Sequence, residues 1–186
     1  MFTVVGISGS LRSGSLNSML LRAAADLMPP DSRLQILSIT EIPLYDGDVE
    51  AAGVPAAVNE AKSAVMAAGA LLIVAPEYNG GMPGVAKNAL DWMSRPPADK
   101  AKVYGGLPVA VTGATPGLLG TATAQAAWLP VLRNLGTEVW PERLLVPYAD
   151  KSFDASGRIT DEKLRTNLGH YMAGFVEWAK KRRALS

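Results

Sequence analysis

The sequence predicts an α/β fold, a three-layer α/β/α sandwich in which helices cover both faces of a parallel sheet. Short apolar segments alternate along the chain with longer segments of helical periodicity. The segment ALLIVA at residues 70–75 has no polar position on either face, which is typical of a central parallel strand. Gly, Pro and hydroxyl residues separate the segments. Strands and helices in alternation form parallel sheets through right-handed crossovers.

The beginning of the chain predicts a strand, a helix, a second strand and a loop. FTVVGIS at residues 2–8 is apolar enough to be a buried strand. Residues 16–28 carry apolar side chains at helical spacing and stop before a Pro-Pro pair, which cannot continue a helix. RLQILSI at residues 33–39 is the second strand, and residues 43–53 are expected to form a loop.

The middle of the chain predicts two helices and two further strands. Residues 55–68 are rich in alanine and start with proline, as the first turn of a helix often does. The apolar run at 70–75 is the third strand. Pro-Gly at residues 83–84 opens a helix that continues through residue 92, and LPVAVTG at 107–113 is the fourth strand.

The last part of the chain predicts a helix, a broken strand and a long terminal helix. Residues 121–135 have helical periodicity and close at Gly136, since glycine is the usual residue just past a helix. TEVWPERLLV at residues 137–146 holds a fifth strand interrupted by proline. Residues 160–183 form the final helix, with TDEK at its start as the cap region.

Five strands in 186 residues favour a flavodoxin-like sheet with strand order 2-1-3-4-5, and residues 1–186 are expected to form a single domain. Ligands of such sheets bind outside the carboxyl ends of the strands, where the order switches between strands one and three. The loops at residues 8–17 and 76–83 are therefore the first places to look for a binding site.

The composition excludes several classes of function. The net charge of +1 gives no reason to expect a nucleic-acid partner. The chain has no cysteine, which excludes disulfides, thiolate catalysis and cysteine metal sites and is compatible with a reducing cytoplasm. The N-terminus lacks a signal-peptide pattern, and the longest apolar run, AVMAAGALLIVA, is too short to span a bilayer. We therefore expect a cytoplasmic protein without membrane insertion.

The first loop, GSLRSGSLN at residues 9–17, has the chemistry of a phosphate site. Backbone N–H groups at the start of a helix attract an anion, and the helix dipole adds to this. Ser10, Ser15 and Asn17 supply hydroxyl and amide donors. Arg12 supplies a charge-assisted contact to a phosphate. The alternative is a plain Gly/Ser-rich turn that caps the helix.

Two common nucleotide motifs are absent from this loop. A P-loop needs a lysine directly after its second glycine, but Ser15 follows Gly14, and no aspartate is placed to hold magnesium. An NTPase is therefore not expected. The dinucleotide pattern G-x-G-x-x-G is also missing, so a tightly held NAD or FAD pyrophosphate is not favoured. A single monophosphate fits the loop better.

The second loop begins PEYNGG at residue 76 and suits a flat ligand. Gly80 and Gly81 allow close approach of the backbone, whose N–H groups would face ring nitrogens and carbonyls. The alternative is a surface turn on which Tyr78 lies and which Asn79 caps. Because the two loops follow neighbouring strands, together they predict a mononucleotide with a bulky base. A flavin is the usual ligand of this kind in the topology.

The segments GSLRSGSLN and PEYNGGMPGVAKNALDW resemble the NAD(P)H-dependent FMN reductase family, with the nearest likeness to its bacterial quinone and chromate reductases. The resemblance covers nearly the whole chain. It implies a homodimer or homotetramer that binds FMN non-covalently at a subunit interface. It also implies NADH or NADPH as co-substrate and a ping-pong reaction, in which a quinone, chromate, azo dye or ferric chelate replaces the nicotinamide. No catalytic side chain is required, because the cofactor carries the chemistry.

The resemblance also implies which residues contact the cofactor. The phosphate end is assigned to the first loop, with Ser10, Leu11, Arg12, Ser15, Leu16 and Asn17. The flavin ring is assigned to the second loop, with Pro76, Glu77, Tyr78, Asn79 and Gly80. A third segment, residues 113–117 after the fourth strand, contributes Gly113 and Thr115. The family often has serine where this chain has Gly81 and Ala114, so hydrogen bonds to the flavin are expected to differ there.

The remaining polar residues have mainly structural interpretations. His170 is expected at the surface or in packing, since a lone histidine is rarely catalytic. The two aspartates of YDGD are expected to be solvated, so no metal is predicted. Residues 91–92 are expected in core packing or at an interface. Arg95 and Glu142 match positions that form a network across subunits in related reductases, with an ordinary solvated charge as the alternative for Arg95.

Two other classes of protein share this topology. A flavodoxin-type electron carrier, which does not oxidise nicotinamide, is the main alternative. Such carriers are usually strongly acidic, which the net charge of +1 does not match. A signalling receiver needs a cluster of aspartates at the strand ends, but the first strand ends in Gly-Ile-Ser and the third in Ala-Pro.

Overall fold

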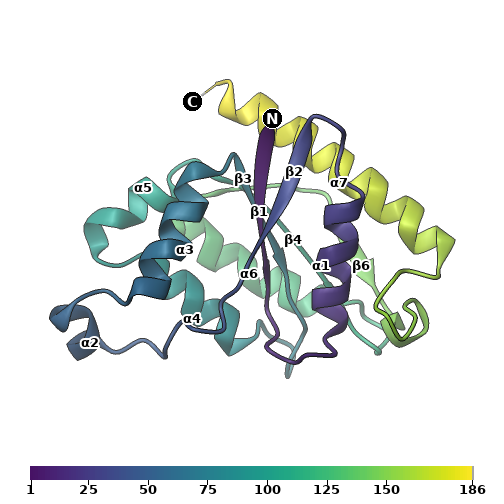
Figure 1. Cartoon of the computed structure of the whole chain (residues 1–186), viewed down its shortest axis with the longest axis horizontal. Coiled ribbons are helices and arrows are strands. Elements are labelled where there is room, and N and C mark those ends of the chain that lie inside the picture. The colour runs from purple at the N-terminus through teal and green to yellow at the C-terminus, as the bar shows by residue number, and fades with distance from the viewer. Residues whose placement is uncertain (186) are drawn as a thin grey trace.

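Within residues 1–185, which the computed structural model describes, six strands form one parallel sheet at the centre of the molecule (Figure 1). The strands are β1 (Phe2–Ser8), β2 (Ser32–Leu37), β3 (Ala70–Val74), β4 (Pro108–Ala114), β5 (Glu138–Val139) and β6 (Leu144–Val146). Their order is β2-β1-β3-β4-β5, with β6 also paired to β4. This order confirms the predicted flavodoxin-like sheet.

The predicted interruption of the fifth strand divides it into two separate pieces. β5 pairs with the start of β4, and β6 pairs with the end of β4. Residues 140–143 between them belong to neither strand, although the Trp140 N–H still donates to the Val109 carbonyl oxygen of β4 at 2.8 Å. Pro141 lies in this gap, and proline has no N–H to donate to a neighbouring strand.

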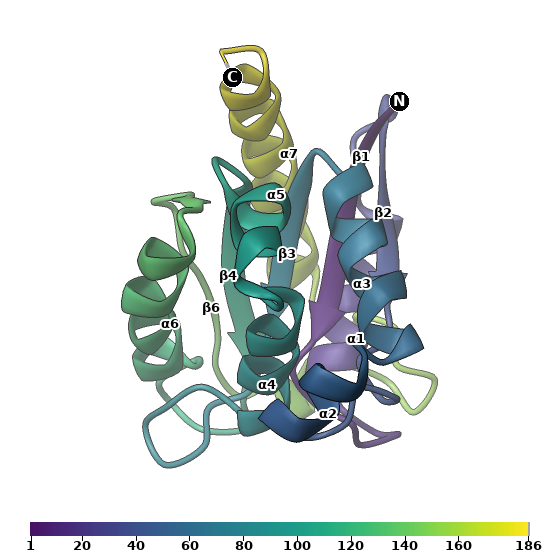
Figure 2. The same cartoon turned by 90° about the vertical axis from the view of Figure 1, so that its left-hand side faces the viewer.

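Helices cover both faces of the sheet (Figures 1 and 2). One face carries α1 (Leu16–Asp26) and α7 (Glu162–Arg183). The other carries α3 (Ala56–Ala67), α4 (Gly84–Met93), α5 (Lys100–Tyr104) and α6 (Ala122–Leu135). Ile73 and Val74, adjacent on β3, pack into opposite cores because successive strand residues point to opposite faces. The predicted three-layer sandwich is thus confirmed.

The prediction of a loop at residues 43–53 is wrong for the second half of this segment. α2 (Gly47–Ala52) forms there, and the Asp46 carboxylate caps it by accepting the N–H of Asp48 at 2.8 Å. The 3-10 turns η1 (Pro97–Asp99) and η2 (Ala149–Lys151) and the short helix α5 were also not predicted. These elements have three to six residues, too few for the hydrophobic periodicity that reveals longer helices.

The boundaries of the long helices differ from prediction by only one or two residues. α1 ends at Asp26 rather than at residue 28. α7 begins after Asp161, whose carboxylate accepts the N–H of Leu164 at 3.1 Å, within the predicted cap region. No helix in residues 1–185 is both long and apolar enough to cross a membrane.

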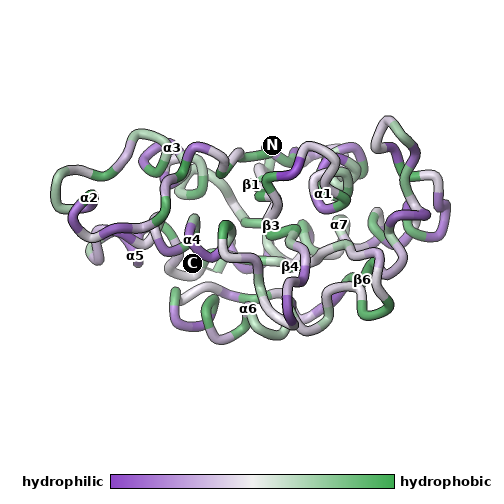
Figure 3. Tube along the Cα trace, turned by 90° about the horizontal axis from the view of Figure 1, so that it is seen from below, coloured by the Kyte–Doolittle hydropathy of each residue, from purple (hydrophilic) through white to green (hydrophobic). Residues whose placement is uncertain are grey.

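The carboxyl ends of β1, β3 and β4 meet at the lower edge of the sheet in Figure 1. Figure 3 looks onto this edge and shows the loops after these three strands gathered around its centre. Gly9, the first residue after β1, lies tightly against the end of β3, since a Cβ there would come within 2.7 Å of the Ala75 Cβ. The first two loops therefore start side by side, as the topology predicts.

Candidate functional site

A cavity of about 620 Å³ opens at the carboxyl ends of β1, β3 and β4. It is lined by residues from four segments of the chain: the first loop, the second loop, the segment after β4, and residues 150–155. Nine of the residues assigned from the sequence line it, namely Ser10, Arg12, Ser15, Leu16, Asn17, Pro76, Glu77, Tyr78 and Thr115. The structure thus brings together the phosphate loop and the ring-binding loop on one cavity.

Four assigned residues do not line this cavity. Leu11 lines a neighbouring cavity on the β2 side of the first loop. Asn79 and Gly80 form the tip of a turn. Gly113 is buried within the sheet, where a Cβ would lie only 2.0 Å from the carbonyl oxygen of Ala75. The requirement for glycine at position 113 therefore comes from the close approach of two strand ends.

The first loop combines helix capping with an exposed cation. The Ser15 hydroxyl accepts the N–H of Ser18 at 3.2 Å and caps α1, so Ser15 has the capping role of the alternative interpretation. Ser15 is buried, whereas Arg12 is exposed at the rim of the cavity. In residues 1–185 no carboxylate pairs with Arg12, so its guanidinium is available to an anion at the N-terminus of α1.

Asn17 connects the first loop to the segment after β4. Its Nδ2 donates to the carbonyl oxygen of Ala114 at 2.9 Å, and its Oδ1 accepts the N–H of Ala114 at 2.8 Å. Asn17 is buried, with 3% of its surface exposed. Its side-chain amide therefore satisfies both backbone groups of Ala114, as a neighbouring strand would.

The second loop is a tight hairpin turn at Asn79-Gly80. Tyr78 and Gly81 exchange two backbone hydrogen bonds, at 3.1 and 3.0 Å. Asn79 and Gly80 both have positive φ, 52° and 72°, as a two-residue turn of type I′ requires. The Asn-Gly pair is a strong sequence signal for a hairpin turn of this type, although no hairpin was predicted here. The turn leaves Tyr78 half exposed beside the cavity.

Glu77 ties the second loop to α6. Its Oε2 accepts the N–H groups of Thr123 and Ala124 at 2.9 and 3.0 Å. The N-cap residue of α6, Thr121, makes no side-chain capping bond of its own. A carboxylate at this end of a helix also interacts favourably with the helix dipole. Glu77 is thus the cap of α6, and its side chain fixes the position of the ring-binding loop.

The fourth wall of the cavity was missed by the sequence analysis. It is lined by Asp150 of η2 and by Phe153, Asp154 and Ala155 of the segment that joins η2 to α7. Hydrogen bonds from the Ser156 hydroxyl and the Arg158 N–H lower the pKa of Asp154. The N–H of Ala149 donates to Thr115, which holds this segment against the third one. An Asp-x-Ser turn signal is present here, but nothing local indicates which cavity it faces.

The residues given structural interpretations occupy structural positions. His170 is exposed on α7 and does not line the cavity. Asp46 caps α2, and Trp92 is buried and donates to the carbonyl of Pro43 at 2.9 Å. Among residues 1–185, no three His, Cys, Asp or Glu side chains come together as a metal site would require.

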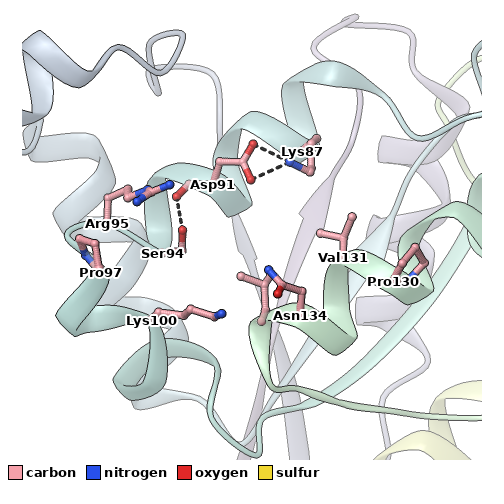
Figure 4. A pocket seen from close by; sticks show the side chains of 10 residues that line it. Lys87, Asp91, Ser94, Arg95, Pro97, Lys100, Pro130, Val131 and Asn134 are labelled. Carbon is pink, nitrogen blue, oxygen red and sulfur yellow. Dashed lines mark hydrogen bonds and ion pairs between the residues drawn. The ribbon is translucent and has the colours of Figure 1, made fainter.

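A second cavity, of about 470 Å³, lies between α4, α5 and α6 (Figure 4). Lys87 and Asp91 form an ion pair on α4, 2.7 Å apart, and face Asn134 on α6. Arg95 lines this cavity and places its guanidinium 5.5 Å from the centre of the Tyr45 ring. Glu142 lines a different cavity, beside Trp140. Arg95 and Glu142 thus line separate cavities, and no ion pair joins them within residues 1–185.

Comparison with known proteins gives consistent results. Residues 2–151 match the model of the family described as NADPH-dependent FMN reductase. The chain is 42% identical over 183 residues to an NAD(P)H-dependent FMN reductase of Pseudomonas aeruginosa, covering 97% of this chain and 96% of that protein. It is 37% identical over 178 residues to a 2-hydroxy-1,4-benzoquinone reductase of Burkholderia, covering 95% and 96%. The solved structure of FerB, a flavoenzyme NAD(P)H:(acceptor) oxidoreductase from Paracoccus denitrificans, superposes with a TM-score of 0.85 at 34% identity, covering 98% and 99%.

Proposed function

Because the chain belongs to the NADPH-dependent FMN reductase family, we propose that the cavity at the ends of β1, β3 and β4 holds FMN, and that the protein uses it to reduce quinones with NAD(P)H. The observation that carries this proposal is the single cavity shared by the phosphate-binding loop and the loop at Pro76–Tyr78. Its volume of about 620 Å³ lies in the range of cofactor sites.

The residues present fit FMN at its phosphate end. The N-terminus of α1 directs unpaired backbone N–H groups toward the cavity, since the first N–H groups of a helix have no partner within it. Arg12 lines the same cavity without a carboxylate partner in residues 1–185. Ser10 adds a hydroxyl. These groups suit a phosphate dianion, and Asn17 holds the loop in place from behind through Ala114.

The opposite end of the cavity fits a flat ring. Pro76 and Tyr78 line it, and the Asn79-Gly80 turn fixes the backbone between them and α4. Glu77 keeps this loop at a constant distance from α6. Bound FMN would supply reversible hydride transfer between nicotinamide and acceptor. The task of the protein is then to hold the ring, leave one face open beside Tyr78, and orient what enters there.

Quinones are the first class of electron acceptor that we propose for this chain. Several of the relatives are named quinone reductases, and that of Burkholderia acts by its name on a hydroxylated benzoquinone. Chromate, azo dyes and ferric chelates are proposed as further acceptors, since an open flavin face places few demands on the acceptor. No proton-transferring side chain is assigned, because the carboxylate of Glu77 is engaged by two N–H groups.

We also propose that the active unit is a homodimer or homotetramer. Leu118, Leu119 and Leu129 on the segment before α6 and on α6 itself are exposed by 68%, 58% and 50%. Leu118 and Leu119 lie just before the end of α6 that Glu77 caps, so a second subunit placed there would border the cofactor. Light scattering of the FMN-loaded protein is expected to give at least twice the chain mass. A fully active monomer would refute this part of the proposal.

The proposed reaction is tested in two half-reactions. Protein loaded with FMN is mixed without oxygen or acceptor with NADPH, and the visible flavin absorbance is expected to bleach. Addition of a benzoquinone is then expected to restore it. Initial rates with both substrates varied should give the parallel double-reciprocal lines of a ping-pong reaction. Retention of the flavin colour after NADPH addition would indicate an electron carrier instead.

A further inference from the structure

One wall of the cavity assigned to FMN has no part in the cofactor assignment. This wall consists of η2 and the residues after it, and Asp150 and Asp154 line the cavity from there. The N–H of Ala149 donates to the Thr115 carbonyl oxygen at 3.0 Å, which holds η2 against the segment after β4. Asp150 therefore has a fixed place beside Thr115, which is one of the residues assigned to the flavin.

Three carboxylates line this cavity, and two of them have partners. The Glu77 carboxylate accepts two N–H groups at the start of α6, where the helix dipole is positive. The Asp154 carboxylate accepts hydrogen bonds from Ser156 and lies 3.8 Å from the Arg158 Nε. In residues 1–185 the Asp150 carboxylate forms neither an ion pair nor a side-chain hydrogen bond, and Asp150 is exposed. Its negative charge therefore faces an incoming molecule without a partner.

The cations near this wall do not cancel that charge. Arg12 is the single lysine or arginine among the described residues that line the cavity, and it is assigned to the FMN phosphate. A phosphate monoester carries more negative charge at neutral pH than one guanidinium neutralises. Lys151 does not line the cavity, and its ammonium lies 5.7 Å from the centre of the Tyr148 ring. With FMN bound, the cavity therefore has an excess of negative charge.

This excess of negative charge affects electron acceptors according to their own charge. An exposed carboxylate acts on a charged molecule over a Debye length of about 10 Å at 0.1 M salt. Neutral quinones are not repelled, whereas chromate and sulfonated dyes are anions and are repelled. The reduced nicotinamide ring is itself uncharged, so the same wall does not exclude it from the flavin.

We propose that Asp150 selects electron acceptors by charge, so that reduced FMN passes its electrons to neutral quinones much faster than to anionic acceptors. Each quinone takes two electrons from the reduced flavin and two protons from the flavin and solvent. It leaves as the hydroquinone, and the flavin returns to its oxidised form. The proposal rests on the proposed FMN site and ranks the acceptors named there, with chromate and anionic azo dyes below the quinones.

Two acceptors with the same ring test this selection. 1,4-Naphthoquinone is neutral, and its 2-sulfonate is an anion. Protein-bound FMN is reduced photochemically without nicotinamide and mixed with either acceptor at low ionic strength, and the return of the flavin absorbance gives the rate constant. The ratio of the rate constant for naphthoquinone to that for its sulfonate is expected to fall at least about threefold in Asp150→Asn, since two unit charges about 6 Å apart in water interact by about that factor. Asp150→Lys should lower the ratio further.

Asp26→Asn is the matched control. Asp26 is exposed, ends α1 at the far end of that helix from the cavity, and does not line the cavity. It removes the same charge from the chain, so an effect of net charge alone would appear in both variants. Asp154→Asn is expected to change the ratio less than Asp150→Asn, because Arg158 offsets Asp154. A ratio that Asp150→Asn changes no more than Asp26→Asn does, or that responds more to Asp154→Asn, would overturn the proposal.

The midpoint potential of the bound FMN gives a readout that does not depend on turnover. Reduced flavin carries an additional negative charge at neutral pH, which the Asp150 carboxylate disfavours, so the potential is expected to rise in Asp150→Asn but not in Asp26→Asn. No rise would overturn the placement of Asp150 beside the flavin, on which the selection depends. If NADPH fails to bleach the flavin, the proposed function fails, and the photochemical experiment still decides the role of Asp150. Failure of the protein to bind FMN would refute both.

Discussion

Asn17 and Ala114, which are 97 residues apart in sequence, are joined by two hydrogen bonds of 2.9 and 2.8 Å between the side-chain amide of one and the backbone of the other. The pair connects the start of α1 to the end of β4. It fixes two of the four segments that line the large cavity relative to each other. The shape of the cavity therefore depends on a contact between two protein residues, to which no ligand contributes.

Substitution of Asn17 by alanine tests this connection. The change leaves the N–H and the carbonyl of Ala114 buried without partners, so the free energy of unfolding is expected to fall by about 1–3 kcal/mol. Urea unfolding of the cofactor-free protein measures it. Asn59→Ala is the control, because Asn59 is exposed and makes one bond to the Val54 carbonyl. A loss no larger than that of the control would contradict the structural role of Asn17.

Substitution of Arg12 by alanine tests the phosphate end of the site. We expect FMN affinity to weaken by about 1.5–3 kcal/mol, the usual contribution of a hydrogen bond to a charged group. Quenching of FMN fluorescence on binding gives the affinity. The stability of the cofactor-free protein should not change, since Arg12 is exposed. Equal flavin retention by the wild type and the variant during gel filtration would refute the assignment.

Two substitutions of Glu77 distinguish the contribution of its hydrogen-bond-accepting oxygen from that of its negative charge. Glu77→Ala removes the cap of α6 and is expected to lower stability by about 0.5–2 kcal/mol. Glu77→Gln keeps an oxygen that accepts the N–H groups of Thr123 and Ala124, so it should recover part of this loss. Thermal unfolding of both variants, with and without FMN, provides the comparison. If glutamine and alanine are equally destabilising, the charge rather than the acceptor geometry holds the helix end.

The pH dependence of stability is expected to report on Asp99. Hydrogen bonds from Lys62 and then Lys102 lower the pKa of Asp99 below its ordinary value of 3.8. A carboxyl whose pKa is lower in the folded state stabilises the fold fully above its ordinary pKa, and this contribution is lost as the pH falls through the folded value. Asp99→Asn should therefore be less stable than wild type at neutral pH, and the difference should narrow below pH 3.8.

Urea unfolding at several pH values measures this difference. Lys62 makes the effect detectable, because it is buried and would lose its carboxylate partner in Asp99→Asn. Glu60→Gln, an exposed position without an ion pair in the described residues, serves as the control. A difference between Asp99→Asn and wild type that stays constant with pH would show that the carboxylate charge is not involved.

The sheet and the long helices could be predicted from the sequence because their signals extend over many residues. β3 is apolar at every position, and α7 has apolar side chains at helical spacing over 22 residues. The short elements were missed because a single cap can be enough to form them, as Asp46 does for α2. Local capping leaves no periodic pattern.

The site was predictable where the residues follow a strand end, and less so elsewhere. The topology alone places the loops after β1 and β3 together. The segment at 150–155 reaches the cavity only through the tertiary packing of Ala149 against Thr115, which no local pattern reveals. Gly113 was assigned to the flavin, but the structure explains this glycine by the nearby carbonyl of Ala75.

The break between β5 and β6 bears on how copies of this chain associate. An uninterrupted edge strand would offer a row of free N–H and carbonyl groups, onto which another molecule could add its own strand. Here only the two residues of β5 and the three of β6 form that border, and Pro141 stands between them. The short, interrupted border disfavours continuation of the sheet into a neighbouring molecule on this side, so any association there would rely on side chains from helices and loops. This arrangement favours a closed complex of few subunits over an open-ended fibre.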